Sequence, residues 1–116
     1  MRFAWIAGVL HAFVGTALLF LTLHPLRDAL DPHALDLMKV GSGWQALNGL
    51  ALMILAASTA ARVPAMLIAA GVAISAAMLY FLIFSGTQPA MMVLVPIGGG
   101  ISMIGWIWLL FVRPKS

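Results

Sequence analysis

Four long apolar segments constrain this chain more than any other feature of its sequence. They cover about residues 3–23, 42–61, 65–85 and 90–112, and none of them contains Asp, Glu, Lys or Arg. Each run is about 20 residues long, which is the length an α-helix needs to cross the hydrocarbon core of a bilayer. Charged residues make up only 8% of the chain, whereas soluble domains carry about 25%. We therefore expect residues 1–116 to form a single integral membrane domain.

The connections between the apolar runs are short, and this determines the expected architecture. The connections are residues 24–41, 62–64 and 86–89, each of which contains proline, and the residue before a proline disfavours α-helical geometry. Short connections place successive helices side by side and antiparallel. The first run is longer than the core of a signal peptide, so we expect it to remain as the first helix. The predicted fold is all-α, a four-helix transmembrane antiparallel bundle.

Lys and Arg are distributed unequally between the two ends of such a bundle, and this predicts its orientation. The cytoplasmic ends of transmembrane helices carry an excess of these residues. We therefore expect a multi-pass protein of the inner (plasma) membrane with both termini in the cytoplasm. The end with the termini and the second turn would hold Arg2, Arg62, Arg113 and Lys115, and the other end Arg27 and Lys39.

Most of the remaining polar residues lie between the first two runs. Residues 24–41 contain all three acidic residues and two of the three histidines. Asp31 followed by Pro32 is typical of a helix N-terminus, with an N-cap and a proline in the first turn. The apolar residues that follow recur at helical spacing. We expect a short amphipathic helix at the membrane interface between helices one and two, and the alternative is an ordinary solvated loop.

Three of the runs carry a stripe of small residues at helical spacing. Small residues let neighbouring membrane helices approach closely, so these stripes predict the faces that pack inside the bundle. The stripe on the first run also includes His11, which we therefore expect to face protein rather than lipid. The predicted packing residues are Gly8 and Gly15 on the first run, Ala69 and Ala73 on the third, and Gly98, Ser102 and Gly105 on the fourth.

A second group of residues predicts a polar cluster inside the membrane. Gln45 and Asn48 share one face of the second run, and Tyr80 lies toward the end of the third. Pro96 is expected to kink or break the fourth helix and to free backbone carbonyls there. We expect Gln45, Asn48, Tyr80 and the carbonyls near Pro96 to meet near the outer leaflet. Such a cluster would bind a small ligand or lipid headgroup, or would lock the bundle.

His11 is the one ionisable residue expected deep in the bilayer, where such residues suggest a function by default. A role as haem or metal ligand is a remote candidate, because no second deep histidine is present. The alternative is a histidine bonded to Asn48, Ser75 or a backbone carbonyl. The chain has no Cys, which removes thiolate sites, and no embedded carboxylate, so we expect no cofactor and no enzyme.

Several short motifs resemble those of the YgdD-like small membrane proteins, a four-helix family catalogued as a domain of unknown function. The similar segments are His24-Pro25-Leu26-Arg27, Leu30 to Leu35, Trp44 to Leu52, Ser75 to Tyr80, and Pro96-Ile97-Gly98-Gly99 followed by Gly105-Trp106. They occur in the family's order over nearly the whole chain. The resemblance implies the fold and a membrane location but no reaction. This chain has Asn48 where the family has its second histidine.

These observations predict a small non-enzymatic membrane protein. We expect an accessory or structural component that packs against a larger membrane complex or associates with itself, because its apolar faces carry no recognisable chemistry. The alternative is a protein that binds a small molecule or a lipid at the outer polar cluster. The chain is basic because Lys and Arg lie beside the apolar runs. Lys and Arg at these places set the orientation of membrane helices, so no nucleic-acid partner is expected.

Overall fold

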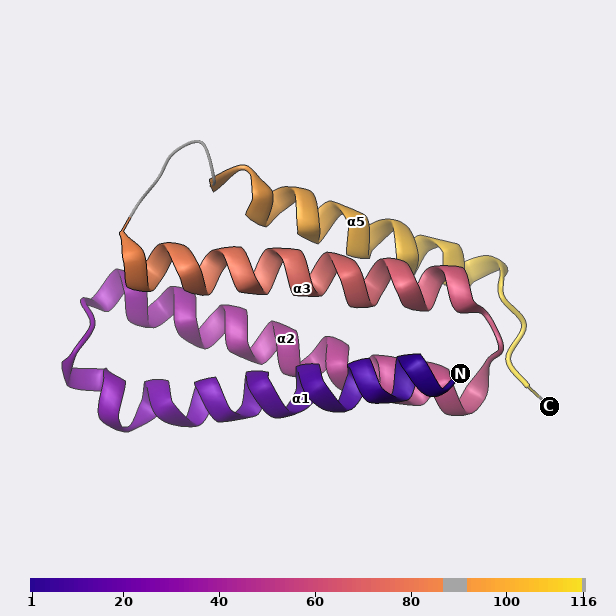
Figure 1. The fold of residues 1–116 in the computed structure, drawn as a ribbon, viewed down its shortest axis with the longest axis horizontal. Coiled ribbons are helices and arrows are strands. Elements are labelled where there is room, and N and C mark those ends of the chain that lie inside the picture. The colour runs from indigo at the N-terminus through magenta and orange to yellow at the C-terminus, as the bar shows by residue number, and fades with distance from the viewer. Residues whose placement is uncertain (87–91, 116) are drawn as a thin grey trace.

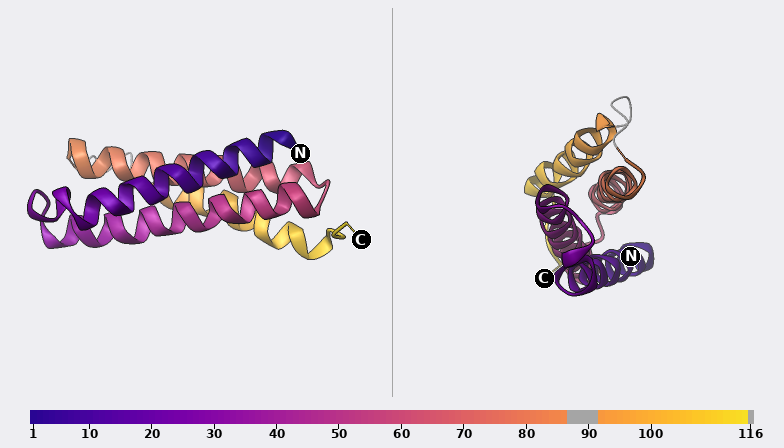
Figure 2. Two further views of the ribbon diagram at one scale, coloured as in Figure 1. Left: turned by 90° about the horizontal axis from the view of Figure 1, so that it is seen from below. Right: turned by 90° about the vertical axis from the view of Figure 1, so that its left-hand side faces the viewer.

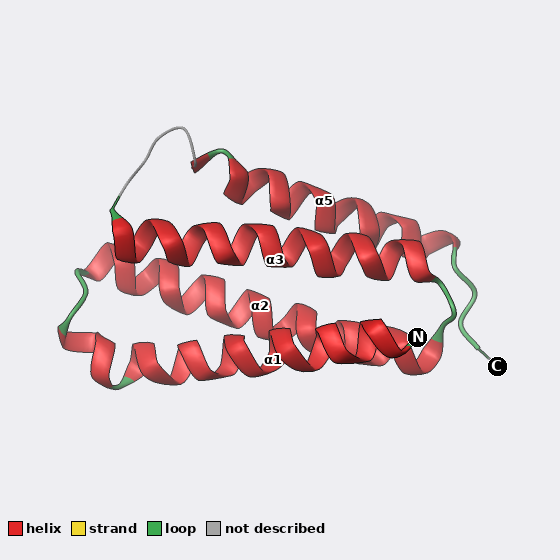
Figure 3. Cartoon of the chain, viewed as in Figure 1, coloured by secondary structure: helices red, strands yellow, loops and turns green. Residues whose placement is uncertain are grey.

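The fold was analysed in a computed structural model, which describes residues 1–86 and 92–115 (Figures 1 and 3). Helices account for nearly all of this part of the chain, and it contains no strand. The predicted all-α class is confirmed. The elements are α1 (Arg2–Leu23), a 3₁₀ turn η1 (Pro25–Asp28), α2 (Pro32–Ser58), α3 (Arg62–Ser85), α5 (Leu94–Trp108) and a final 3₁₀ turn η2 (Leu109–Phe111). Most of the predicted turn at 86–89, and residues 90–91 of the fourth run, lie outside the described residues.

The four long helices run up and down along one axis, and both termini lie at the same end (Figure 1). α1 packs along α2, α3 packs along α5, and α2 also contacts α3. Seen end-on, the two pairs occupy opposite sides of the molecule (Figure 2). The bundle measures 48 × 30 × 19 Å, so its long axis exceeds the hydrocarbon core of a bilayer, which is about 30 Å thick.

All four helices are long and apolar enough to cross a membrane. Large apolar side chains cover their outer surfaces, for example Phe13 on α1, Leu47 on α2 and Ile104 on α5. An outward-facing apolar surface suits lipid rather than water. The chain is a multi-pass membrane protein, and each of the four apolar runs overlaps one of these helices.

The amphipathic segment is not a separate interfacial helix, which corrects the sequence prediction. Helix α2 begins at Pro32 and continues without a break through Gly41-Ser42-Gly43, the point where the second span was expected to start. A Cβ on Gly41 would collide with Leu79 of α3, so its small size serves helix packing rather than helix termination. The hydroxyl of Ser42 donates to the carbonyl of Met38 at 2.6 Å. Tertiary packing here overrides weak helix propensity.

The extra length of α2 changes where its polar residues lie. Its 27 residues rise about 40 Å at about 1.5 Å per residue, which is more than the hydrocarbon thickness. The first turns, with His33, Asp36 and Lys39, therefore extend past the apolar part of the bundle. Asp31 forms the predicted N-cap, and its carboxylate accepts a hydrogen bond from the amide of Ala34 at 2.8 Å.

Two other helix boundaries differ from the predictions, and in both cases a proline lies in a first turn. Helix α3 begins at Arg62, so Pro64 is helical and the turn falls at Thr59 to Ala61. Helix α5 begins at Leu94, so Pro96 also lies in a first turn. A first-turn proline removes no intrahelical hydrogen bond. The fourth run is interrupted at Val93, close to this proline, which agrees with the expected kink or break, but the Val93 carbonyl accepts a hydrogen bond from the amide of Ile97 and is not free.

Small residues line the contacts within each helix pair. Gly8 and Gly15 of α1 are buried against the backbone of α2, and Gly98 of α5 is buried against α3. On α3 the buried face is centred on Gly71 and Ser75, and Ala69 is only half-buried. Ala73 is exposed, so its assignment to the internal packing face is wrong. The other two packing residues of α5, Ser102 and Gly105, are buried.

Candidate functional site

A chain of hydrogen bonds crosses the middle of the bundle and joins α1, α2 and α3. The hydroxyl of Tyr80 donates to Oε1 of Gln45 at 2.7 Å. Nε2 of Gln45 lies 3.1 Å from Nδ1 of His11. Nε2 of His11 lies 3.1 Å from the carbonyl oxygen of Ala69. We call these four groups the His11 network.

The backbone carbonyl of Ala69 fixes the direction of every bond in the His11 network. A carbonyl only accepts, so Nε2 of His11 must carry a hydrogen and donate to it. In a neutral imidazole, Nδ1 is then an acceptor, which requires the NH₂ group of Gln45 to face it. The amide oxygen of Gln45 consequently faces Tyr80 and accepts its hydroxyl hydrogen. The network has one consistent arrangement when His11 is neutral.

A second polar contact joins α5 to α2. The indole N–H of Trp106 donates to Oδ1 of Asn48 at 3.0 Å, and the amide nitrogen of Asn48 donates to the carbonyl of Trp44 at 2.9 Å. Asn48 is 3% exposed and Gln45 is 5% exposed, so both amides depend on protein partners. Together they tie α2 to each of the other three long helices.

The structure gives the position of each polar residue along its helix. Gln45 is at the midpoint of α2, and His11 is near the midpoint of α1. The first turns of α2, as far as Lys39, extend past the apolar part of the bundle, so Gln45 lies between one and two turns inside it. Tyr80 lies toward the same end of the bundle on α3. The place of the cluster near the outer leaflet stays a prediction.

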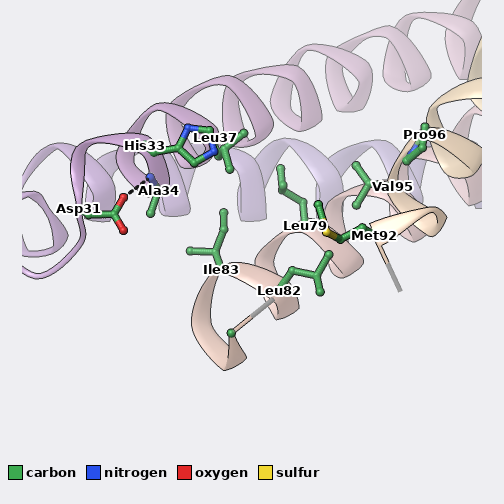
Figure 4. A pocket seen from close by; sticks show the side chains of 11 residues that line it. Asp31, His33, Ala34, Leu37, Leu79, Leu82, Ile83, Met92, Val95 and Pro96 are labelled. Atoms are coloured by element: carbon green, nitrogen blue, oxygen red, sulfur yellow. Dashed lines mark hydrogen bonds between the residues drawn. The ribbon is translucent and has the colours of Figure 1, made fainter. Parts of the chain in front are cut away.

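Of the four predicted cluster residues, the structure brings Gln45 and Tyr80 together and places Asn48 one turn further along α2. Pro96 is not among them. It lines a cleft of about 560 Å³ at the opposite end of the bundle from the termini, between the ends of α2, α3 and α5 (Figure 4). Leu37, Leu79 and Val95 face one another across this cleft, and Asp31 and His33 lie at its polar edge. We call it the outer cleft, where "outer" means the end of the bundle away from the termini.

Two partners in these networks were not predicted. Trp106 was interpreted only as an interfacial aromatic residue, although an indole N–H in an apolar region needs an acceptor. The partner of His11 was expected to be Asn48, Ser75 or a carbonyl. His11 does bond to a backbone carbonyl, that of Ala69, but the side-chain amide that bonds to it belongs to Gln45 and not to Asn48. The close contact of Gly15 with Ser42 and Ala46 sets the register of α1 against α2, and sequence alone does not give that register.

The geometry offers little to a metal ion. Both ring nitrogens of His11 are engaged in hydrogen bonds, so a metal would have to displace Gln45 or the Ala69 carbonyl. Among residues 1–86 and 92–115, no group of three or more His, Cys, Asp or Glu side chains is arranged to hold a metal. A ligand role for His11 stays a remote prediction.

Comparison with known families matches residues 21–99 to the protein family of unknown function DUF423. The matched region is more than half of the chain. The chain belongs to this family. The region includes α2, α3 and the outer cleft, whereas His11 and Trp106 lie outside it. Neither the curated proteins nor the solved structures contain a match to the chain. Membership in DUF423 agrees with the resemblance seen in the sequence and assigns no reaction.

Proposed function

We propose that this DUF423 protein is a non-enzymatic accessory component of the inner (plasma) membrane that associates with a larger membrane complex or with copies of itself. One observation carries this proposal. Ala69, Ala73 and Ala77 recur every four residues along α3, and the bundle leaves Ala73 and Ala77 exposed. We call these residues the alanine stripe.

An exposed stripe of this kind favours association with another helix. Lipid tails are as apolar as leucine side chains, so membrane helices associate mainly through close packing and hydrogen bonds. Small residues spaced four apart let two backbones approach. On α5, Gly99 and Gly100 also have open space where a Cβ would lie. The buried amides, by contrast, are engaged inside the bundle, which supports a structural rather than a catalytic use of them.

Disulfide cross-linking tests this proposal cleanly, because the chain has no native cysteine. The variant Ala73→Cys, oxidised in native membranes, should give a cross-linked species containing a second copy or a complex subunit. The matched control is Leu50→Cys, an exposed position on α2, which should remain monomeric. Equal cross-linking at both positions, or none at Ala73→Cys together with only monomer in native mass spectrometry, would contradict the proposal.

A second candidate function is the binding of a lipid or another small amphiphile, and the outer cleft favours it. Its volume lies within the range of ligand pockets, about 300–1,000 Å³. Its walls are mainly apolar, and Asp31 and His33 lie at the edge, where a polar headgroup would be. This cleft replaces the predicted polar cluster as the place for a ligand, and Pro96 is the one predicted residue that lines it.

Native mass spectrometry of the protein purified in mild detergent tests this second candidate. The variant Ala34→Phe would fill the cleft and should lose a copurified lipid that the natural chain retains. Ala29→Phe, an exposed position outside the cleft lining, should retain it. Retention of the same lipid by both variants would remove the outer cleft from consideration.

A further inference from the structure

We propose that His11 is the proton-binding site of a switch in which its protonation reverses the Gln45 amide and releases the Tyr80 hydroxyl. The direction of the hydrogen bonds in the His11 network depends on the charge of His11. When His11 is neutral, Nδ1 accepts from the NH₂ group of Gln45, and Nε2 donates to the Ala69 carbonyl. Every group in the network then has a complementary partner.

Protonation of His11 breaks one hydrogen bond of this network, the bond between Nδ1 of His11 and the NH₂ group of Gln45. Both ring nitrogens of a charged imidazole are donors. The bond from Nε2 to the Ala69 carbonyl is unaffected, but Nδ1–H now faces the NH₂ group of Gln45, so two donors meet. The conflict is relieved when the Gln45 amide turns over and presents Oε1 to His11. The only covalent bond that forms is the N–H bond at Nδ1, and the added proton stays there while the amide turns about its single bonds.

The reversed amide cannot keep Tyr80 as a donor. Its NH₂ group now faces the Tyr80 oxygen, which can accept from it, but the hydroxyl hydrogen has lost its acceptor. Within residues 1–86 and 92–115, the hydroxyl of Tyr80 has no acceptor other than Gln45. The Tyr80 hydroxyl is part-buried among apolar helices, where a donor without a partner is unfavourable. The hydroxyl must therefore rotate or move away, and the change at His11 on α1 reaches α3.

Within residues 1–86 and 92–115, Tyr80 is the one titratable residue besides His11 in the membrane-spanning parts of the four helices. On α2, which faces His11 with Gln45, there is no Asp, Lys, Arg or His between Val40 and Ser58. On α3, Tyr80 is the one titratable residue between Val63 and Ser85, and α5 has none between Leu94 and Trp108. The other charged residues of the three helices, such as Arg62 and Lys39, lie toward helix ends. The network therefore responds to the charge of His11 itself.

The released tyrosine is next in sequence to a residue that lines the outer cleft. Leu79, the residue before Tyr80, lines the cleft and packs over Gly41 of α2. Tyr80 also lies close to Gly41, since a Cβ there would come within 3.8 Å of the tyrosine ring. Loss of the Tyr80–Gln45 bond removes the polar tie between α2 and α3 at this depth. Protonation of His11 thus loosens one wall of the outer cleft.

Tyr80 is the only tyrosine of the chain, so one NMR signal reports on the switch. The full-length protein would be labelled with carbon-13 at the ring carbon that bears the hydroxyl, placed in nanodiscs, and titrated between about pH 8 and about pH 5, the range in which histidine changes charge. We expect the Tyr80 signal to shift in one step, with the same midpoint as the His11 ring signals.

Three variants separate the switch from other effects of acid. In His11→Gln the Tyr80 signal should no longer depend on pH. In Gln45→Met the His11 ring should still titrate while the Tyr80 signal stays constant, because the amide that couples them is absent. The combined control His24→Gln and His33→Gln, which changes only the two exposed histidines, should keep the step. A Tyr80 signal that does not shift in the natural chain, or that shifts unchanged in His11→Gln, would overturn the proposal.

Discussion

At the scale of single residues, glycines with different surroundings should respond differently to the same substitution. A Cβ on Gly15 would lie 2.6 Å from both the backbone nitrogen of Ala46 and the carbonyl oxygen of Ser42. These are backbone atoms of α2 and cannot move without shifting the helix. Gly15→Ala should therefore separate α1 from α2 and destabilise the protein by about 1–3 kcal/mol. Thermal unfolding in one detergent measures the effect.

Gly43 provides the matched control for Gly15. It lies in the interior of α2, and a Cβ there would meet nothing within 4 Å. Alanine is the better helix former by about 1 kcal/mol. Gly43→Ala should leave the unfolding temperature unchanged or raise it. A loss as large as that of Gly15→Ala would mean that both glycines act through helix flexibility rather than close contact.

Trp106 and Trp108 allow a second comparison between residues of one type. Their exposures are nearly equal, 43% and 46%, but only Trp106 donates a hydrogen bond to Asn48. Trp106→Phe should leave the Asn48 oxygen without its donor and lower stability by about 0.6–2 kcal/mol. Trp108→Phe should have a smaller effect on thermal unfolding. Equal losses would indicate that ring packing, rather than the indole N–H, matters at position 106.

Individual polar residues were easier to predict than their partners. Gln45, Asn48, Tyr80 and His11 stand out because polar side chains are rare in the apolar runs. Which of them meet depends on the depth of each helix and on its rotation. The start of α2 was predicted at Ser42 rather than at Pro32, because Gly41 and Gly43 were interpreted as a helix boundary. The pairing of His11 with Gln45 follows only when the Gly15 contact sets the register of α1 and α2.

At the scale of helices, the N-terminus of α2 depends on Asp31. Its carboxylate accepts the amide hydrogen of Ala34, and Pro32 follows it in the first turn. Asp31→Ala should fray the first turn and reduce stability by about 0.5–2 kcal/mol. Hydrogen exchange at the Ala34 and Leu35 amides should become faster. Asp36→Ala, an exposed substitution within the same helix, should leave those two amides protected, and fast exchange in both variants would contradict the role of the cap.

Helix existence was predictable because it follows from the length of each apolar run, whereas helix boundaries were not. Glycine and proline act as breakers only where nothing compensates for them. Gly41 is compensated by its contact with Leu79, and Pro64 and Pro96 lie in first turns. The packing face of α3 was also predicted on the wrong side of the helix, because alanines occur on more than one side of it. Small size identifies faces suited to helix packing, but the partner decides which face is used.

At the scale of the whole molecule, α2 holds the bundle together. The α1–α2 pair and the α3–α5 pair each pack through small residues, and α2 provides the larger part of the contact between the pairs. Its buried amides reach α1 and α3 through Gln45 and α5 through Asn48. The hydrogen bonds of Tyr80 with Gln45 and of Trp106 with Asn48 join the two pairs. Loss of the first bond would let the α3–α5 pair move relative to the α1–α2 pair while each pair stays packed. This is the motion that the His11 switch would use.

The charge difference between the two ends of the bundle predicts how the whole molecule sits in the membrane. Arg2, Arg62, Arg113 and Lys115 belong to the end that carries both termini (Figure 1). Loops rich in Lys and Arg stay in the cytoplasm, so this end should face inward. Because the chain has no cysteine, Ala60→Cys at the α2–α3 turn and Ala29→Cys at the opposite end can be compared without changing any charge. Both positions are exposed.

In intact cells, a membrane-impermeant thiol reagent should label Ala29→Cys and leave Ala60→Cys unlabelled until the membrane is opened. The two variants control for each other, since each must react once both sides are accessible. Labelling of Ala60→Cys alone would show that the outer cleft and Asp31 face the cytoplasm. Labelling of both in intact cells would mean two opposite orientations. In that case the four cations at the end with the termini do not outweigh Arg27 and Lys39 at the other.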